Sequence, residues 1–533
     1  MTRYTEGGDV DHCVFIQANQ KQMLGAIVAE YALRRNSNHN DRFDVRIMNY
    51  DDFPVLRNRE GDKFLRGGER RIWVRDDLQS FTPSRFMPPE LMGFRSRSQT
   101  KPQGVFAARR SEQWRCCMPN DPATPTSKNH PETEVLTRGY DPRLSVGSVR
   151  PAVFRSSTYA FSSPESAERA FLIALGKERP AVGEDVELIY SRLSHPNAEI
   201  LEDQIVPLDR GASAAAVFNS GMAAIGTVLF NLCRPGSAVI HTVPIYGGTH
   251  HLLNEILIPW GIDSVAVAAG DGPALERAIR ETPNLRVVLI ETPANPTLRM
   301  TDIAAAVYAG RERRDRPCIV IDNTFLGPVF QHPLELGADL CIYSATKYLA
   351  GFSDMLGGVV TARDPALIET FKGTRALLGN ILQPDESWLL DSRLPTLSLR
   401  MHHQSENAIQ LAEALADHPR VDHIHYPMFF LEPDQRRIYE TQCDHPGAVF
   451  SLEIAGGKKA AFDFLRRLKI TRNAVSLGGM ESLTCHPATT THSEMSEIQL
   501  LQAGVTDGLV RVSVGIEDWR DLLRDYTDAL DAV

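Results

Sequence analysis

Lys347 and Asp322 are two ionisable residues of this 533-residue chain whose positions suggest chemistry. Each follows an apolar stretch with the composition of a buried strand, IVI before Asp322 and LCIY shortly before Lys347. Ser344 and Thr346 alternate around Ala345, so both hydroxyls can point to one side. A lysine beside a buried strand is costly unless it is paired, hydrogen-bonded or covalently used. The pattern indicates a ligand site, with a lysine that pairs at the surface as the alternative.

Three further apolar stretches also end in residues that could contact a ligand. In FNSGMAAIGTVLF the Ser220-Gly221 turn precedes a helix whose free N–H groups could hold a phosphate. Tyr246 precedes Gly247-Gly248 and could stack on a planar ring, and Asn295 lies between prolines in ETPANP. Each feature alone also fits an ordinary turn or a core tyrosine. Together they place polar residues at one edge of a predicted sheet, where open α/β sheets bind ligands.

The elements that must position these residues are predicted from apolar and amphipathic stretches that alternate between residues 199 and 393. The expected strands are 214–218, 238–241, 264–268, 286–290, 318–321, 339–344 and 357–362, and the expected helices include 221–232, 272–281 and 301–313. Near-continuous apolar strands that alternate with helices are typical of a mostly parallel sheet covered on both faces.

The sequence divides the chain into five segments. Residues 1–93 form an N-terminal extension, and residues 94–139, rich in Pro, Ser, Thr and Arg, are an expected disordered linker. Residues 140–198 form an N-terminal arm, and residues 199–393 form the large domain. Residues 394–533 form a smaller α+β domain that begins with the long helical pattern SLRMHHQSENAIQLAEALADH.

Composition limits the class of protein further. A net charge of −10, with 43% hydrophobic and 23% charged residues, is typical of a soluble globular protein and gives no electrostatic case for nucleic acid or membrane. Eight cysteines without CxxC spacing, and an N-terminus without an apolar signal, predict a cytoplasmic protein with reduced thiols. His402-His403 and His423-x-His425 have no complementary carboxylate or cysteine, so no metal site is expected.

Together these motifs resemble those of the Cys/Met-metabolism family of pyridoxal-phosphate enzymes. The matching segments are NSGMAAI, YGGTH, ETPANP, IDNTFLGPVF, SATKYLAGFSD, SLGGMESLTCHP, THS and LVRVSVGIED, between about residue 140 and the C-terminus. The resemblance implies fold type I of these enzymes (aspartate-aminotransferase-like), with a helix-covered, mostly parallel sheet and a smaller α+β domain. It also implies pyridoxal 5′-phosphate as cofactor, a small amino-acid substrate and a homo-oligomer, commonly a dimer of dimers.

The resemblance also implies a role for each matching residue. Lys347 would attach covalently to the cofactor and move protons, Tyr246 would stack on its ring and assist proton transfer, and Asp322 would bond its pyridine nitrogen. The remaining roles fall to Gly221, Met222, Ser344 and Thr346 for the phosphate, to Tyr190 and Arg192 for the phosphate of a neighbouring subunit, and to Asn295 and Arg511, with Ser476 nearby, for the substrate's α-carboxylate. Judged without the resemblance, Arg511 could equally be a surface arginine at a strand end.

Several positions depart from the family pattern or bear on the reaction. His195-Pro196-Asn197 replaces the usual Asn-Pro-Thr, and Phe352 replaces the usual His of Gly-His-Ser-Asp. Members that handle cystathionine tend to carry Glu at the position of Val475, and the apolar valine favours a less charged γ-substituent. Conversely, typical methionine γ-lyases have Cys at the position of Gly248. We therefore expect γ-elimination or γ-replacement of the methionine γ-lyase type on a sulfur-containing or homoserine-derived amino acid. A cystathionine γ-synthase or O-acylhomoserine sulfhydrylase is the nearest alternative, and a non-catalytic scaffold a more remote one.

Residues 1–93 lie outside this family pattern. They begin with a strand-like run and a helical pattern, HCVFIQANQKQMLGAIVAEYALRR, and are weakly similar to the start of a nucleotide-sugar glycosyltransferase. The similarity ends before any Asp-x-Asp metal motif, so no function is assigned to this segment.

Overall fold

The computed structural model of the chain describes residues 12–18, 43–49, 63–66, 69–72, 129–181 and 184–533. The chain divides into two units, Met1–Ala108 and Arg109–Val533. In the first unit β1 (His12–Ala18) pairs in parallel with β2 (Phe43–Asn49), and β3 (Lys63–Arg66) pairs antiparallel with β4 (Glu69–Ile72). The helical pattern predicted after β1, and the predicted linker up to residue 128, lie outside the described residues.

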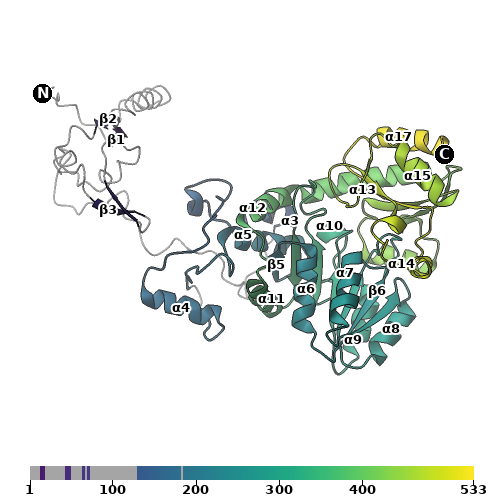
Figure 1. Cartoon of the computed structure of the whole chain (residues 1–533), viewed down its shortest axis with the longest axis horizontal. Coiled ribbons are helices and arrows are strands. Elements are labelled where there is room, and N and C mark those ends of the chain that lie inside the picture. The colour runs from purple at the N-terminus through teal and green to yellow at the C-terminus, as the bar shows by residue number, and fades with distance from the viewer. Residues whose placement is uncertain (1–11, 19–42, 50–62, 67–68, 73–128, 182–183) are drawn as a thin grey trace. The chain divides into compact units, whose positions relative to one another are not determined.

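A seven-stranded sheet of order β5-β11-β10-β9-β8-β6-β7 forms the centre of the second unit (Figure 1). Its strands are β5 (Ala214–Phe218), β6 (Ala238–Val243), β7 (Asp263–Ala268), β8 (Leu285–Glu291), β9 (Cys318–Asp322), β10 (Leu340–Ser344) and β11 (Gly358–Ala362). Neighbouring strands are parallel except at β11, which runs antiparallel to β5 and β10. The predicted mostly parallel sheet is confirmed, and each expected strand agrees with an observed one to within about two residues at either end.

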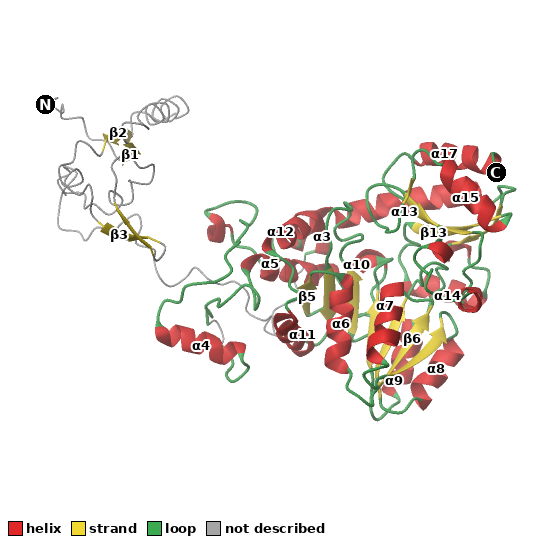
Figure 2. Ribbon diagram, in the orientation of Figure 1, coloured by secondary structure: helices red, strands yellow, loops and turns green. Residues whose placement is uncertain are grey.

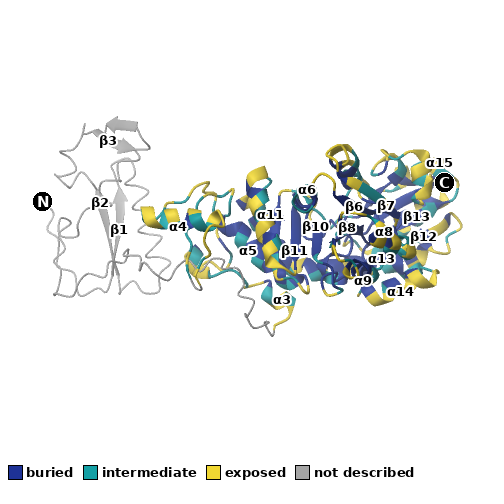
Figure 3. Ribbon diagram, turned by 90° about the horizontal axis from the view of Figure 1, so that it is seen from below, coloured by how far each residue is buried: buried dark blue, intermediate teal, exposed yellow. Residues whose placement is uncertain are grey.

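Helices bury both faces of this sheet, because successive residues of a strand point to opposite sides. On β8, Val287 and Leu289 pack with α6 (Gly221–Leu232) and α11 (Pro365–Leu378), whereas Val288 and Ile290 pack with α8 (Gly272–Glu281) and α9 (Ile303–Arg311). Figure 3 shows the strands as a buried layer between helices with exposed outer faces. Helices α6 and α8 have the predicted bounds, but α9 begins two residues later than predicted because Asp302 caps it, accepting from the backbone N–H of Ala305.

The C-terminal part of the chain forms a second sheet of order β12-β13-β16-β15-β14 (Figure 2). Its strands are β12 (Val421–His425), β13 (Val449–Ile454), β14 (Arg472–Asn473), β15 (Leu483–Cys485) and β16 (Leu509–Ser513), and its main helices are α13 (Leu397–Leu415), α15 (Gly457–Arg467) and α17 (Trp519–Asp531). Helix α13 contacts both β13 and α17 of this domain and the short α10 (Gly327–Phe330) of the large domain. The smaller α+β arrangement was predicted, and the exact domain boundaries stay a prediction.

The segment 295–303 of the large domain is hydrogen-bonded to the small domain along its length. Gln435 exchanges two bonds with the backbone of Met300, at 2.7 and 2.8 Å, and Gln442 accepts the N–H of Ile303 at 3.1 Å. Both glutamines lie on α14 (Pro433–Gln442). The Ser451 hydroxyl on β13 donates to the carbonyl of Pro296 at 2.8 Å. The two domains therefore meet at a polar, buried seam.

The remaining described elements are short or lie before the large sheet. They are α3 (Pro131–Glu134), η4 (Pro142–Ser145), α4 (Pro164–Ala174), α5 (Pro196–Ile205), η5 (Val206–Leu208), α7 (Gly247–His251), η6 (Leu252–Leu257), α12 (Pro384–Arg393), η7 (Leu394–Thr396), η8 (Pro427–Phe429), η9 (Pro487–Thr489) and α16 (Glu497–Gln502). None of the helices in the described part of the chain has both the length and the hydropathy needed to cross a membrane.

Candidate active site

The strand ends bring the predicted residues to one edge of the large sheet. Glu291 and Asp322 end β8 and β9 and are register partners. Ser344 ends β10 opposite Gly358 of β11, and Gly358 also pairs with Phe218 at the end of β5, three residues before α6 begins. Segments that are distant in sequence therefore converge where a parallel sheet offers a ligand site.

Asp322 is held through its neighbour Thr324, which the sequence analysis did not identify. The Thr324 hydroxyl and backbone N–H donate to Asp322 Oδ1 at 2.6 and 3.1 Å, and the N–H of Ser344 donates to Thr324 Oγ1 at 2.9 Å. Burial raises the pKa of Asp322, although the bonds from Thr324 act to lower it. A cationic partner would offset the cost of burying the charged form, so Asp322 fits a protonated ring nitrogen.

The amine of Lys347 is largely buried in the turn after β10. Nζ donates to Ser476 Oγ at 2.8 Å, and within the described ranges Lys347 forms no ion pair. Burial, together with the positive charge of Arg511, lowers the pKa of Lys347 to about 8. A buried lysine that is readily neutral can act as a nucleophile and a base, so it fits covalent attachment to a carbonyl cofactor.

Ser476 connects Lys347 to Arg511. Its carbonyl accepts from Arg511 Nη2 at 2.8 Å, and its φ of +135° is rare for a residue other than glycine. Arg511, on β16, also donates through Nη1 to Asn295 Oδ1 at 2.9 Å. The guanidinium is buried, and among the described residues it pairs with no carboxylate. A buried cation beside an amide fits the carboxylate of a ligand, which would supply the missing counter-charge.

The predicted phosphate site combines a helix N-terminus with β10. Ser220 caps α6, and a Cβ at Gly221 would lie 3.1 Å from the Cβ of Ser344, so glycine permits this close approach. The first N–H groups of α6 fit an anion there. The Thr346 hydroxyl, which was also predicted to bind the phosphate, is hydrogen-bonded to the backbone of Gly357. It donates to the Gly357 carbonyl at 3.3 Å and accepts the Gly357 N–H at 3.1 Å.

Tyr246 lies at the start of α7 with 46% of its surface exposed. A Cβ at Gly248 would lie 2.7 Å from the Tyr246 ring and 3.0 Å from Met222 Sδ. The absence of a side chain at Gly248 therefore gives space to the Tyr246 ring, and cysteine at this position would displace it.

Two further residues of the site are buried, namely Glu291 of the ETPANP motif and His492 of the THS motif, and the sequence predicted no role for either. The Glu291 carboxylate accepts the backbone N–H groups of Tyr246 and Asn295, both at 2.8 Å. His492 Nε2 donates to the carbonyl of Asn295 at 3.1 Å. An acid at the end of a continuous apolar strand was the signal that could have identified Glu291, as it identified Asp322.

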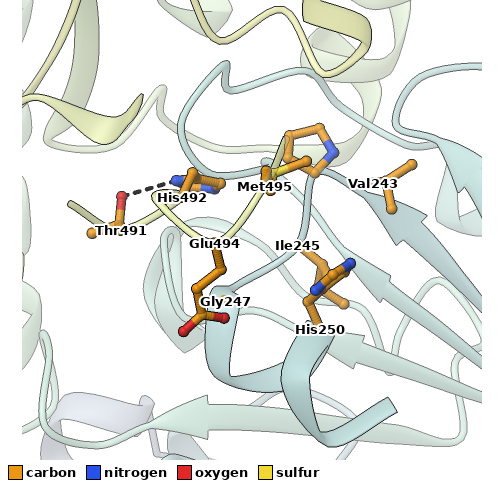
Figure 4. A pocket seen from close by; sticks show the side chains of 9 residues that line it. Val243, Ile245, Gly247, His250, Thr491, His492, Glu494 and Met495 are labelled. Carbon is orange, nitrogen blue, oxygen red and sulfur yellow. Dashed lines mark hydrogen bonds between the residues drawn. The ribbon is translucent and has the colours of Figure 1, made fainter. Parts of the chain in front are cut away.

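His492 also lines a small apolar pocket beside the site (Figure 4). The pocket lies between the start of α7 and the segment 491–495, and its lining residues are Val243, Pro244, Ile245, Gly247, His250, Thr491, His492, Glu494 and Met495. The Thr491 hydroxyl lies 2.9 Å from His492 Nδ1. Burial, followed by the charge of Arg511, lowers the pKa of His492 to about 4, so its ring is neutral at neutral pH.

Tyr190 and Arg192 make their contacts away from this cluster. The Arg192 guanidinium lies 5.8 Å from the centroid of the Tyr190 ring and donates to the carbonyl of Ala376 on α11. Tyr190 is 41% exposed. Their predicted reach into a neighbouring subunit stays a prediction.

The departures from the family pattern at His195-Pro196-Asn197 and at Phe352 make contacts within this chain. His195 caps α5, accepting from Ala198 N–H through Nδ1, and Asn197 holds the arm by donating to Ala152 and accepting from Phe154. The centroid of the Phe352 ring lies 4.5 Å from Cζ of Arg393. In the described part of the chain no three His, Cys, Asp or Glu side chains are grouped as metal ligands would be.

Comparisons with known proteins identify the family. Residues 132–531 match the family model described as Cys/Met metabolism PLP-dependent enzyme. The chain is 38% identical over 402 residues to the L-methionine gamma-lyase of Pseudomonas putida, covering 75% of this chain and 97% of that protein. It is also 38% identical over 356 residues to the cystathionine gamma-lyase of Bacillus subtilis strain 168, covering 67% and 92%. Among solved structures, a cystathionine gamma synthase from Xanthomonas oryzae pv. oryzae in complex with cystathionine matches with a TM-score of 0.68 and 33% identity, covering 76% of this chain and 98% of that chain.

Proposed function

Because the chain belongs to the Cys/Met-metabolism family of PLP-dependent enzymes, we propose that it catalyses γ-elimination or γ-replacement on a sulfur-containing or homoserine-derived amino acid. The family and its fold type I agree with the sequence predictions, and its members are PLP-dependent lyases and synthases. The observation that carries the proposal is the row of hydrogen bonds from Lys347 through Ser476 and Arg511 to Asn295. This row holds an amine beside a pair of groups suited to a carboxylate, as an amino-acid substrate requires.

Pyridoxal phosphate, when bound, supplies an electron sink that stabilises carbanions at the substrate's Cα and Cβ. Lys347 would hold the cofactor covalently, and the carboxylate of Asp322 would accept a hydrogen bond from its protonated ring nitrogen. Backbone N–H groups of Gly221 and Met222 would hold the phosphate. The hydroxyls of Ser344 and Thr346 complete that set, and the Thr346 hydroxyl would exchange its bonds to Gly357 for it.

On the substrate side, the chain's own groups bind, orient and move protons. Arg511 and Asn295 would bind the α-carboxylate, since the guanidinium can donate to both oxygens. Ser476 orients the amine of Lys347 through its hydroxyl. Lys347 would remove protons at Cα and Cβ and, in γ-elimination, would return one at Cγ, whereas in γ-replacement the incoming nucleophile binds Cγ. This task suits an amine whose pKa is lowered to about 8 by burial and by the charge of Arg511. Tyr246 would lie against the ring and assist the leaving group.

Val475 supports the methionine-type reading of the reaction. It directly precedes Ser476, is 56% exposed and carries no charge that could pair with the distal ammonium of cystathionine. The second candidate is a cystathionine γ-synthase or an O-acylhomoserine sulfhydrylase. The observation behind the first of these is the 33% identity to a cystathionine gamma synthase, of which 98% is covered.

The functional form, on this proposal, is a homo-oligomer, commonly a dimer of dimers. The half-exposed Tyr190 and the adjacent Arg192 would reach the phosphate of a neighbouring subunit. Among the described residues, the Arg192 guanidinium contacts Ala376 on α11 and the Tyr190 ring, and no hydrogen bond joins either residue to Lys347, which is consistent with this assignment.

The test is a comparison of substrates on the full-length protein loaded with pyridoxal phosphate. Release of 2-oxobutyrate from methionine, O-acetylhomoserine and cystathionine is measured, with and without excess thiol or cysteine. We expect methionine to give the fastest release and Lys347→Ala to give none. Faster conversion to a replacement product with thiol or cysteine would favour the second candidate. Absence of turnover with all three substrates would leave the fold as a non-catalytic scaffold.

A further inference from the structure

Glu291 has a buried carboxylate for which the reaction outlined above has no use. Its two oxygens each accept one backbone N–H, Oε2 from Tyr246 and Oε1 from Asn295, both at 2.8 Å. Tyr246 precedes Glu291 by 45 residues and Asn295 follows it by four. One carboxylate therefore joins the loop after β6 to the loop after β8.

The position of Glu291 is itself fixed by the sheet. Its N–H donates to Thr242 Oγ1 on β6 at 3.0 Å, and Asp322 is its register partner on β9. Burial and the negative charge of Asp322 raise the pKa of Glu291 to about 8, while its two N–H donors and Arg511 act in the opposite direction. The carboxylate is thus kept in a place that penalises its charge, which is characteristic of functional sites.

Asn295 shows what the carboxylate holds in place. Its N–H is bound by Glu291, its carbonyl by His492 at 3.1 Å, and its side-chain oxygen by Arg511 at 2.9 Å. Of these three partners of Asn295, Glu291 is the one that also accepts the backbone N–H of Tyr246. The separation between the backbones of Tyr246 and Asn295 is therefore set by the width of one carboxylate.

We propose that Glu291 is a positioning residue, which holds the backbones of Tyr246 and Asn295 together so that both side chains keep their places relative to Lys347. The roles of those two side chains rest on the proposed function. The two N–H donors act to lower the pKa of Glu291, so both bonds favour its ionised form and are strongest when the carboxylate is charged. Loss of either bond removes the connection that Glu291 makes between the two loops.

The test compares amide hydrogen exchange in the full-length protein loaded with pyridoxal phosphate, together with kcat and KM. Glu291→Gln keeps the size but has one acceptor oxygen, so its NH2 group opposes one of the two N–H donors. Glu291→Asp keeps the charge but is one methylene shorter and cannot reach both. Asp525→Asn is the matched control, because Asp525 is a buried carboxylate in the small domain that accepts the N–H groups of Lys469 and Ile470, each at 2.9 Å.

Both Glu291 variants should exchange the amide of Tyr246, of Asn295 or of both about tenfold faster or more. Both should also raise KM and lower kcat. Asp525→Asn should accelerate exchange at its own partners and leave kcat and KM unchanged. Wild-type exchange at both amides in either Glu291 variant would overturn the proposal, as would faster exchange spread evenly over the whole sheet. If no substrate is turned over, the proposed function fails, while the exchange rates still decide whether Glu291 positions the two loops.

Discussion

At the scale of single residues, the burial of Lys347 links its charge state to its reactivity. Only the neutral amine adds to an aldehyde, and burial together with Arg511 lowers its pKa to about 8. In the cofactor-free protein, the rate of covalent attachment of pyridoxal phosphate should therefore rise with pH and reach half its plateau near pH 8. Arg511→Gln removes a positive charge that disfavours the ammonium form, so its midpoint should move to higher pH.

This rate is measured from the absorbance change after mixing between about pH 6 and pH 11, a range that includes the ordinary pKa of lysine. A wild-type midpoint at that ordinary value would show that the burial of Lys347 does not control its reactivity.

Val475 offers a second test at the residue scale. A carboxylate at this exposed position beside Ser476 can pair with the distal ammonium of cystathionine, whereas methionine has no such group. Val475→Glu should raise the ratio of kcat/KM for cystathionine to that for methionine by about tenfold, or about 1.4 kcal/mol. Val475→Gln, which is of the same size and neutral, should leave the ratio within about twofold of the wild type. An equal shift in both variants would assign the effect to shape.

At the scale of elements, the N-terminus of α6 allows a comparison of two glycines in one helix. A Cβ at Gly221 would lie 3.1 Å from the Cβ of Ser344, whereas a Cβ at Gly226 would have ordinary contact with Phe230 at 3.7 Å. Gly221→Ala should weaken binding of pyridoxal phosphate about tenfold by moving α6 away from β10. Gly226→Ala should keep the affinity and stabilise the helix by about 0.5–1 kcal/mol.

Equilibrium binding and thermal unfolding of both variants test this contrast. Unchanged affinity in Gly221→Ala would mean that the close approach of α6 to Ser344 does not serve the phosphate.

The elements were predictable from the sequence where one physical signal dominates. Continuous apolar runs located all seven strands of the large sheet. Six of these strands are largely buried on both faces, whereas the edge strand β7 is mostly exposed or half-buried. Asp322, the last residue of β9, and Lys347, shortly after β10, were identified from the same apolar runs. The role of Glu291 and the link that Thr324 makes between Asp322 and Ser344 were not identified, because both depend on a backbone N–H group as donor. A backbone donor has no sequence signature, so such contacts appear only in three dimensions.

At the scale of the whole molecule, the predicted sharing of Arg192 between subunits can be tested by complementation. If each site takes Lys347 from one subunit and Arg192 from its neighbour, Lys347→Ala and Arg192→Ala are each inactive alone. After dissociation and random reassociation, half of the dimers are mixed and each has one intact site of two. About a quarter of the wild-type activity should then return.

Mixing Lys347→Ala with the double variant, Lys347→Ala and Arg192→Ala, is the control and should restore nothing. A mixture of the two single variants that also stays inactive would place Arg192 in the same site as the Lys347 of its own chain.

The hydrogen-bonded seam along residues 295–303 has a consequence for how the large and small domains lose their structure. The buried amides of Gln435 and Gln442 would be left without partners if one domain came apart alone, so separate melting is penalised. Heating should therefore give one cooperative transition for residues from about 199 to the C-terminus, with equal calorimetric and van't Hoff enthalpies in scanning calorimetry. Two resolved transitions would contradict this. An amino acid bound by Arg511 and Asn295 would contact both domains at the same seam, and so would raise the unfolding temperature of the two domains together.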